Sequence, residues 1–157
     1  MNGINQHQIT KMNTKQMIQV PELAKITKCY SHAVKVPLDS NRDLVFIGGQ
    51  LPKDREGCVV GIGDPEAQAR AVFANLEKVL EAAGGDLQDL VSITIYLKST
   101  KDFPAISKVR DALFTNYAPS SSVVEVTAVC REDYLLEVNG IAVIHRNTSE
   151  ELEEGLC

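Results

Sequence analysis

Aromatic side chains and positive charge are both scarce in this sequence. Phenylalanine, tyrosine and tryptophan make up 5% of the 157 residues, and there is no tryptophan. Acidic residues outnumber lysine and arginine by 21 to 16, which gives a formal net charge of -5. Proteins that bind nucleic acid present a basic face, often with aromatic side chains on which bases stack. The composition therefore argues against nucleic acid as a partner.

Long apolar runs and paired cysteines are also missing. No apolar stretch approaches the roughly 18 residues of a membrane span, and the N-terminus lacks the charged-then-apolar order of a secretory signal. The four cysteines show no CxxC spacing, so neither a zinc site nor a disulfide framework is indicated. We expect a cytoplasmic protein with free thiols, no metal, no cofactor and no membrane partner.

The length fits one domain with a sizeable core. Residues 1–19 are polar with isolated apolar positions, and we expect a flexible extension there. Residues 147–157 hold four glutamates and no basic residue, which is typical of a solvated acidic tail. The folded domain is therefore predicted to span residues 20–146.

Periodicity predicts two strands, a helix, a strand, a helix and two final strands. The predicted strands before the last pair are His32–Leu38, Leu44–Ile47 and Leu90–Lys98, and Gly48 with Gly49 marks a bulge or close backbone approach. The first helix begins at Asp64 and Pro65 and ends at Gly84 and Gly85, and the second is capped by Asp102, with a core stripe of Phe103, Ile106, Val109, Leu113 and Tyr117. Both helices are expected on one face of a mixed sheet, which defines an α+β fold.

The last two strands hold the first candidate for a site. Two β-rich runs, Ser121–Val129 and Leu135–Ile144, flank the polar turn Cys130–Tyr134 and predict a hairpin. In the second run, Glu137 and Asn139 share a face with apolar residues. Burying a carboxylate there is costly unless it has a partner or a task. A functional Glu137 is favoured over a structural acid paired with Arg131, in the turn just before the second run, or with a neighbouring subunit.

Four segments of the chain resemble the Rid family, the reactive intermediate deaminases also called YjgF or L-PSP. These segments are KCYSHAV, VFIGGQLP, AQARAVFANLEKVLEAAGGDLQDLVSITIYLKSTKDF and SVVEV with LLEVNGIAV, within residues 28–144. The resemblance implies a chorismate-mutase-like fold, a homotrimer, and a small-molecule ligand in the cleft between subunits. The best-known members hydrolyse enamines and imines to a keto acid and ammonia, and others are described as ribonucleases or translation inhibitors.

The same resemblance implies roles for individual residues. Tyr30 matches the family's site tyrosine, although it equally fits a packing role, Gly49 matches the glycine whose backbone faces the ligand, and Glu137 matches the glutamate that positions or activates water. The chain departs from the pattern P-x-R-S-x-V-E-V, because PSSSVVEV places Ser121 where the arginine belongs. A guanidinium forms a bidentate clamp on a carboxylate, and losing such bonds costs ~1.5–3 kcal/mol apiece. Asn139 also stands where many members of the family carry a second acid.

The predicted site therefore consists of Glu137 as the catalytic residue and Tyr30, Gly49, Ser121, Ser122 and Asn139 as substrate-binding residues. Cys130 has no neighbouring base in the sequence, so we expect no nucleophilic role for it. His32 and His145 are expected at the surface or at strand ends.

Three functions remain open at this point. The first is an enamine or imine deaminase with altered substrate choice, the second a trimer that binds a small molecule without chemistry, and the third a ribonuclease-like activity. A pocket with convergent polar groups and an unpaired Glu137 favours the first, whereas a pocket filled by side chains favours the second. The acidic charge makes the third the weakest.

Overall fold

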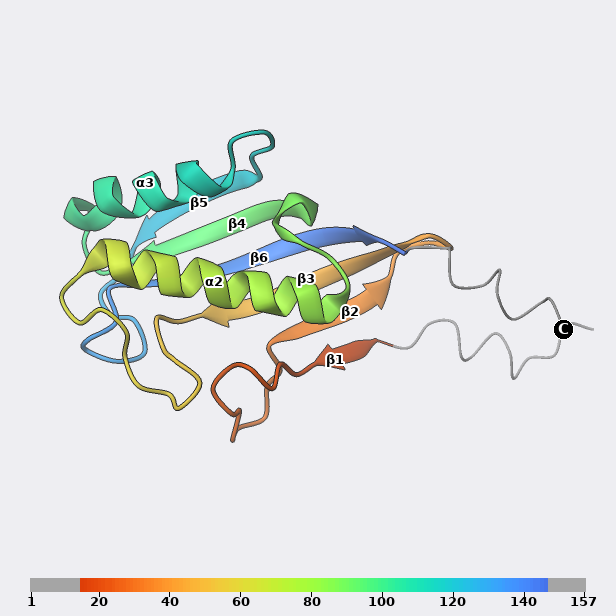
Figure 1. The fold of residues 1–157 in the computed structure, drawn as a ribbon, viewed down its shortest axis with the longest axis horizontal. Helices are drawn as coiled ribbons and strands as arrows, with labels where there is room; N and C mark the ends of the chain where they lie inside the picture. The colour runs from red at the N-terminus through yellow and green to blue at the C-terminus, as the bar shows by residue number, and fades with distance from the viewer. Residues whose placement is uncertain (1–14, 147–157) are drawn as a thin grey trace, which may run out of the picture.

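The structure, a computed structural model, describes residues 15–146. Within that range one six-stranded sheet is covered on one face by two helices (Figure 1). The strands are β1 Gln16–Ile18, β2 Ala33–Pro37, β3 Arg42–Gln50, β4 Leu90–Leu97, β5 Ser120–Glu125 and β6 Leu136–His145; the helices are α2 Pro65–Ala83 and α3 Phe103–Leu113, preceded by short 3-10 turns η1 Leu87–Asp89 before β4 and η2 Thr100–Asp102 before α3. The predicted mixed sheet with two helices on one face is confirmed.

The order of strands across the sheet is β1-β2-β3-β6-β4-β5. β4 lies between the last two strands, pairing with β5 in parallel and with β6 in antiparallel orientation. The predicted hairpin of the last two strands is therefore wrong. Alternation and a polar turn fix where strands run but not their partners. β4 has the most apolar buried side, with Leu90, Ile93, Ile95 and Leu97 at 1% exposure or less, and the interior position buries that side fully.

Helix α2 begins and ends where the sequence predicts. The carboxylate of Asp64 accepts a hydrogen bond from the backbone N–H of Ala67 at 3.0 Å, and Pro65 occupies the first turn. Gly84 ends the helix with a φ of 93°, a left-handed conformation that favours glycine.

Helix α3 departs from the prediction at both ends. The side chain of Asp102 makes no capping hydrogen bond, because the turn η2 already starts at Ser99, whose hydroxyl accepts from Lys101 N at 3.3 Å. Ile106 and Val109 are buried as expected. Tyr117 lies beyond the helix and is 44% exposed, so it does not belong to the core stripe.

The two faces of the sheet differ in burial as the alternation in β6 predicts. On the helix side, Leu136, Val138, Ala142 and Ile144 are buried. On the other side, which we call the open face, Glu137, Asn139, Ile141 and Val143 are half-buried. Within residues 15–146 no helix covers the open face (Figure 1). The functional candidates of β6, Glu137 and Asn139, lie on that face.

Strand β1 was missed by the sequence analysis, which placed residues 1–19 in an extension. β1 pairs with β2, and only Ile18 of its three residues is buried, so it shows no readable period. Residues 1–14 and the predicted acidic tail, 147–157, lie outside the described residues. No helix within residues 15–146 is long and apolar enough to cross a membrane.

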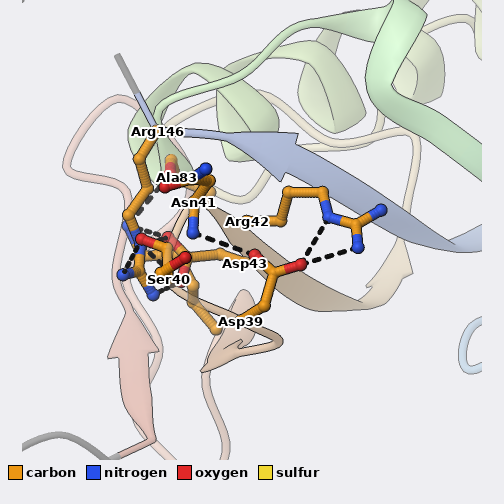
Figure 2. A network of polar contacts seen from close by, with 8 residues as sticks. Asp39, Ser40, Asn41, Arg42, Asp43, Ala83 and Arg146 are labelled. Atoms are coloured by element: carbon orange, nitrogen blue, oxygen red, sulfur yellow. Dashed lines mark hydrogen bonds and ion pairs between the residues drawn. The ribbon is translucent and has the colours of Figure 1, made fainter. Parts of the chain in front are cut away.

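A polar cluster closes the sheet at the end of β6 (Figure 2). The Arg146 guanidinium donates to both carboxylate oxygens of Asp43 at 3.1 Å through Nε and also to the carbonyl of Ser40. Lys35 adds a second cation 3.8 Å from Asp43 and donates to the carbonyl of Ala83 at the end of α2. The Arg146 hydrogen bonds hold the pKa of Asp43 below its usual value. This cluster joins the turn between β2 and β3 to the end of α2 and to the residue that follows β6, and its role is structural.

Candidate functional site

A cavity of about 260 Å³ opens between the ends of β3 and β6 and the segments that follow β1 and β3. It brings together three residues predicted for the site, Tyr30, Gly49 and Glu137. Its remaining walls are formed by apolar, polar and charged residues: Leu23, Ala24, Ser31, His32, Gly48, Gln50, Leu51, Lys53, Asn75 and Cys130. The cavity is thus open to a ligand and lined by convergent polar groups.

A β-bulge in β3 positions Gly49 against Glu137. The pairing with β6 shifts between Ile47, opposite Gly140, and Gln50, opposite Val138, so β3 contains one extra residue there. A Cβ atom at position 49 would overlap the Glu137 carboxylate. The predicted bulge at the glycine pair is confirmed, and its effect is to let the carboxylate lie on the backbone of β3.

The Glu137 carboxylate has no hydrogen bond or ion pair within residues 15–146, although its residue is half-buried. Arg131 does not pair with it and instead stacks on Tyr134, with its guanidinium carbon 5.6 Å from the ring centre. Burial alone raises the pKa of Glu137. An acid with a raised pKa and free oxygens is suited to take up and return a proton near neutral pH.

His32 is buried, not a surface residue, and lies just before β2. Its Nδ1 accepts the backbone N–H of Val20 at 3.0 Å, and its carbonyl accepts the N–H of Gly48 at 2.9 Å. Burial, and next the charge of Lys53, lower the pKa of His32, which favours the neutral ring that such acceptance requires. His32 therefore joins the segment after β1, including Leu23, to the bulge and shapes the cavity.

Two buried amides fix the opposite wall and were missed by sequence reasoning. Asn75 of α2 donates to the carbonyls of Leu51 and Lys53, each at 3.0 Å, and Gln50 donates to the carbonyl of Gly48 at 2.9 Å. Asn75 interrupts the apolar stripe of α2, and a polar residue on a buried helix face was the available signal. Lys53 gave no signal, because a charged residue in a polar loop is ordinary.

Ser122 and Asn139 lie on the open face but outside the main cavity. They pair with Thr94 from either side, forming a row across three strands. Asn139 and Glu137 both line a second, shallower hollow of about 200 Å³. Asn139 is thus adjacent to the catalytic candidate, and Ser122 is two strands away.

Ser121 does not join Glu137 within one chain. It pairs with Ile93, which is buried under the helices, so Ser121 faces the helix side. There its hydroxyl lies 3.5 Å from Nη1 of Arg110. Glu137 pairs with Tyr96, on the opposite face. A side chain at position 121 can approach a Glu137 only from another chain.

The described residues contain no candidate metal site. No group of three or more His, Cys, Asp or Glu side chains within residues 15–146 is placed to hold a metal ion. The polar side chains that line the cavity include one carboxylate, one ammonium, a tyrosine, a serine, a histidine, a cysteine and two amides. Such a set is able to bind a small polar molecule and to exchange protons with it.

Comparison with known proteins assigns the fold to a family. The model of the family described as endoribonuclease L-PSP matches residues 17–144. The crystal structure of RidA from an Antarctic Psychrobacter aligns with a TM-score of 0.73 and 32% identity, covering 82% of this chain and 99% of that one. The chain therefore belongs to the Rid/YjgF/L-PSP family, with its chorismate-mutase-like fold.

Two relatives are named as deaminases. The 3-aminoacrylate deaminase RutC of Acinetobacter baylyi is 35% identical over 107 residues, which is 68% of this chain and 84% of that protein. The 2-iminobutanoate/2-iminopropanoate deaminase of Dermatophagoides farinae is 29% identical over 133 residues, 85% of this chain and 99% of the relative. The family thus includes enzymes that deaminate small enamines and imines.

Proposed function

We propose that this protein hydrolyses a small enamine or imine, with Glu137 as the catalytic residue. The observation that supports it is the unpaired, half-buried Glu137 carboxylate facing an open cavity. A carboxylate held there at a cost in desolvation has no structural partner within residues 15–146 to account for it. A trimer that binds a small molecule without chemistry was expected to have a pocket filled by side chains. The open cavity therefore favours the hydrolase over that alternative.

The reaction follows from the groups present. An enamine first gains a proton on carbon and loses one from nitrogen, which makes it the tautomeric imine. Glu137 removes a proton from water, whose oxygen bonds to the imine carbon while the C=N electrons move to nitrogen. Glu137, now protonated, returns that proton to nitrogen and gives a carbinolamine. Glu137 then takes the proton of the new hydroxyl group and passes it to the amino nitrogen; the C–N bond breaks as the C=O bond forms, and ammonia leaves with a carbonyl product. Gly49 aligns the carboxylate for this exchange.

Release of ammonia from imines generated in situ tests the role of Glu137. Glu137→Gln keeps the shape of the side chain and removes the base, so we expect at least a roughly 100-fold loss of kcat. Glu77→Gln, on the exposed side of α2, changes the net charge equally and is the control. Equal activity of Glu137→Gln and wild type would refute the assignment.

A homotrimer with its ligand in the cleft between subunits is the assembly we propose. An apolar row crosses the open face through paired residues of four neighbouring strands, Met17, Val34, Phe46 and Ile141. Met17 and Phe46 are 70% and 47% exposed. Exposed apolar surface of this kind marks an interface. The edge position of Ser121, facing away from Glu137 of its own chain, also fits a site shared between chains.

A ribonuclease activity finds less support. The net charge is -5, and the main cavity is lined by a single Lys or Arg side chain among the described residues. RNA binding relies on several cations along the backbone and on aromatic stacking.

The free, exposed thiols of Cys29, Cys58 and Cys130 support a reducing, cytoplasmic setting for the proposed enzyme.

A further inference from the structure

We infer that Lys53 is the residue that selects an anionic substrate, holding a carboxylate of the enamine or imine in the cavity that Glu137 also lines. This inference rests on the proposed deaminase function and adds the residue that holds the carboxylate of the substrate. The position where the family pattern has arginine is Ser121 here, and it faces the helix side in its own chain.

Lys53 is the one Lys or Arg side chain lining the main cavity among the described residues. Its ammonium makes no hydrogen bond and no ion pair within residues 15–146, and the residue is half-buried. A lysine ammonium that lines a cavity without a partner is free to pair with an anionic ligand.

The backbone of Lys53 is held rigidly, which fixes where its side chain starts. Asn75 donates to its carbonyl at 3.0 Å, its N–H donates to the carbonyl of Leu51 at 2.9 Å, and it pairs with Val59 in an isolated bridge. A binding group on a fixed backbone loses less freedom when a ligand is bound.

Lys53 and Glu137 share the cavity but do not pair with each other. Burial alone shifts the pKa of Glu137, whereas the charge of Lys53 acts on the neighbouring ring of His32. Both charged groups line the same cavity, and neither has an ion-pair partner within residues 15–146.

The size of the space sets the size of the ligand. The cavity, at about 260 Å³, falls below the roughly 300–1,000 Å³ of sites for drug-sized molecules. A compound of a few carbon atoms, with a carboxylate at one end and the C=N group at the other, fits both the space and the charges.

Arg110 is the alternative cation, and its contacts argue against it. Its Nη2 lies 2.8 Å from the carboxylate of Asp111, its Nη1 3.5 Å from Ser121, and its guanidinium carbon 5.5 Å from the centre of the Phe103 ring. Arg110 is thus already engaged, on the helix side of the sheet.

The test compares two imines that differ in charge alone, a 2-imino acid and the corresponding carboxamide. Lys53→Met should lower kcat/KM for the acid about 10- to 100-fold, chiefly through KM, and change the carboxamide rate less than about twofold. Lys53→Arg should restore most of the loss. Lys78→Met, an exposed lysine of α2, is the control of equal charge and should match wild type.

Failure of this inference is distinct from failure of the proposed function. If Glu137→Gln abolishes both reactions and Lys53→Met leaves the preference for the acid unchanged, Lys53 is refuted and the deaminase stands. If wild type hydrolyses neither imine, the proposed deaminase function is refuted. Calorimetric binding of 2-oxobutanoate to wild type and to Lys53→Met then tests whether Lys53 binds a carboxylate. Weaker binding by Lys53→Met supports the carboxylate site. Equal binding, or none by wild type, overturns it.

Discussion

The carboxylate of Glu137 occupies the space where a side chain of residue 49 would stand. Gly49 is therefore required for the position of an acid 88 residues later in the chain, since 137 minus 49 is 88. The bulge in β3 thus places the backbone of Gly49 against the unpaired carboxylate of β6.

Gly49→Ala should impair catalysis without unfolding the protein. The added methyl group displaces the end of a flexible side chain, so we expect a loss of only a few degrees in Tm. The carboxylate moves by about 1 Å or more, and misplacement of that order costs about 100-fold in rate. Steady-state ammonia release and thermal melts measure the two effects. In the Glu137→Gln background, Gly49→Ala should add no further loss of rate; an additive loss would show that Gly49 acts independently of Glu137.

Glu137→Gln should raise thermal stability at neutral pH. Burial lifts the pKa of Glu137 in the folded state above its ordinary value. Between these two pKa values the folded protein binds more protons than the unfolded chain, so wild type loses stability as the pH rises through that window. Glutamine has no such penalty. Melting curves across pH should show the variant a few degrees more stable at neutral pH, with the advantage vanishing below the ordinary pKa of glutamate. A variant less stable than wild type at every pH would indicate that the carboxylate has a stabilising partner.

Asp43→Asn should show the opposite pH dependence. Hydrogen bonds from Arg146 depress the pKa of Asp43. Its contribution is fully present above the unfolded-state pKa and is lost as the pH falls through the lower folded-state value. We expect the variant to melt several degrees lower at neutral pH and to converge with wild type in acid. Asp39→Asn removes the exposed pair with Arg42 in the same turn (Figure 2) and should have a smaller effect. An equal loss of melting temperature in the two variants would mean that burial of Asp43 adds nothing to the stability that its ion pair provides.

The sequence alone was sufficient for the bounds of helix α2 and for the face of β6. Asp64, Pro65 and Gly84 act within a few residues of their own position, so their roles in α2 are readable from neighbours. The alternation around Glu137 is equally local. Strand partners depend on residues far along the chain, and this is why the insertion of β4 between β5 and β6 was missed.

The site was predictable only in part, for the same reason. Tyr30, Gly49 and Glu137, which the family resemblance named, line one cavity, and their roles in it stay predictions. His32 and Lys53 line the cavity from loops, and the spacing of apolar residues in a sequence does not predict the path of a loop. The direction of Ser121 depends on its register with β4, which the sequence does not display.

Phe46 is the residue through which the proposed trimer interface can be tested. Phe46 lies in the middle of the apolar row on the open face, 47% exposed in the single chain. If that row is the trimer interface, Phe46→Lys places a charge in it without a partner and should shift the protein from trimer to monomer in sedimentation at micromolar concentration. Ile62→Lys, an exposed apolar residue before α2, is the matched control and should remain trimeric. Because the cleft between chains is proposed to complete the site, the Phe46→Lys monomer should also lose deaminase activity while keeping a cooperative melt. A wild type that sediments as a stable monomer would refute the trimer, and a fully active Phe46→Lys monomer would refute the shared site.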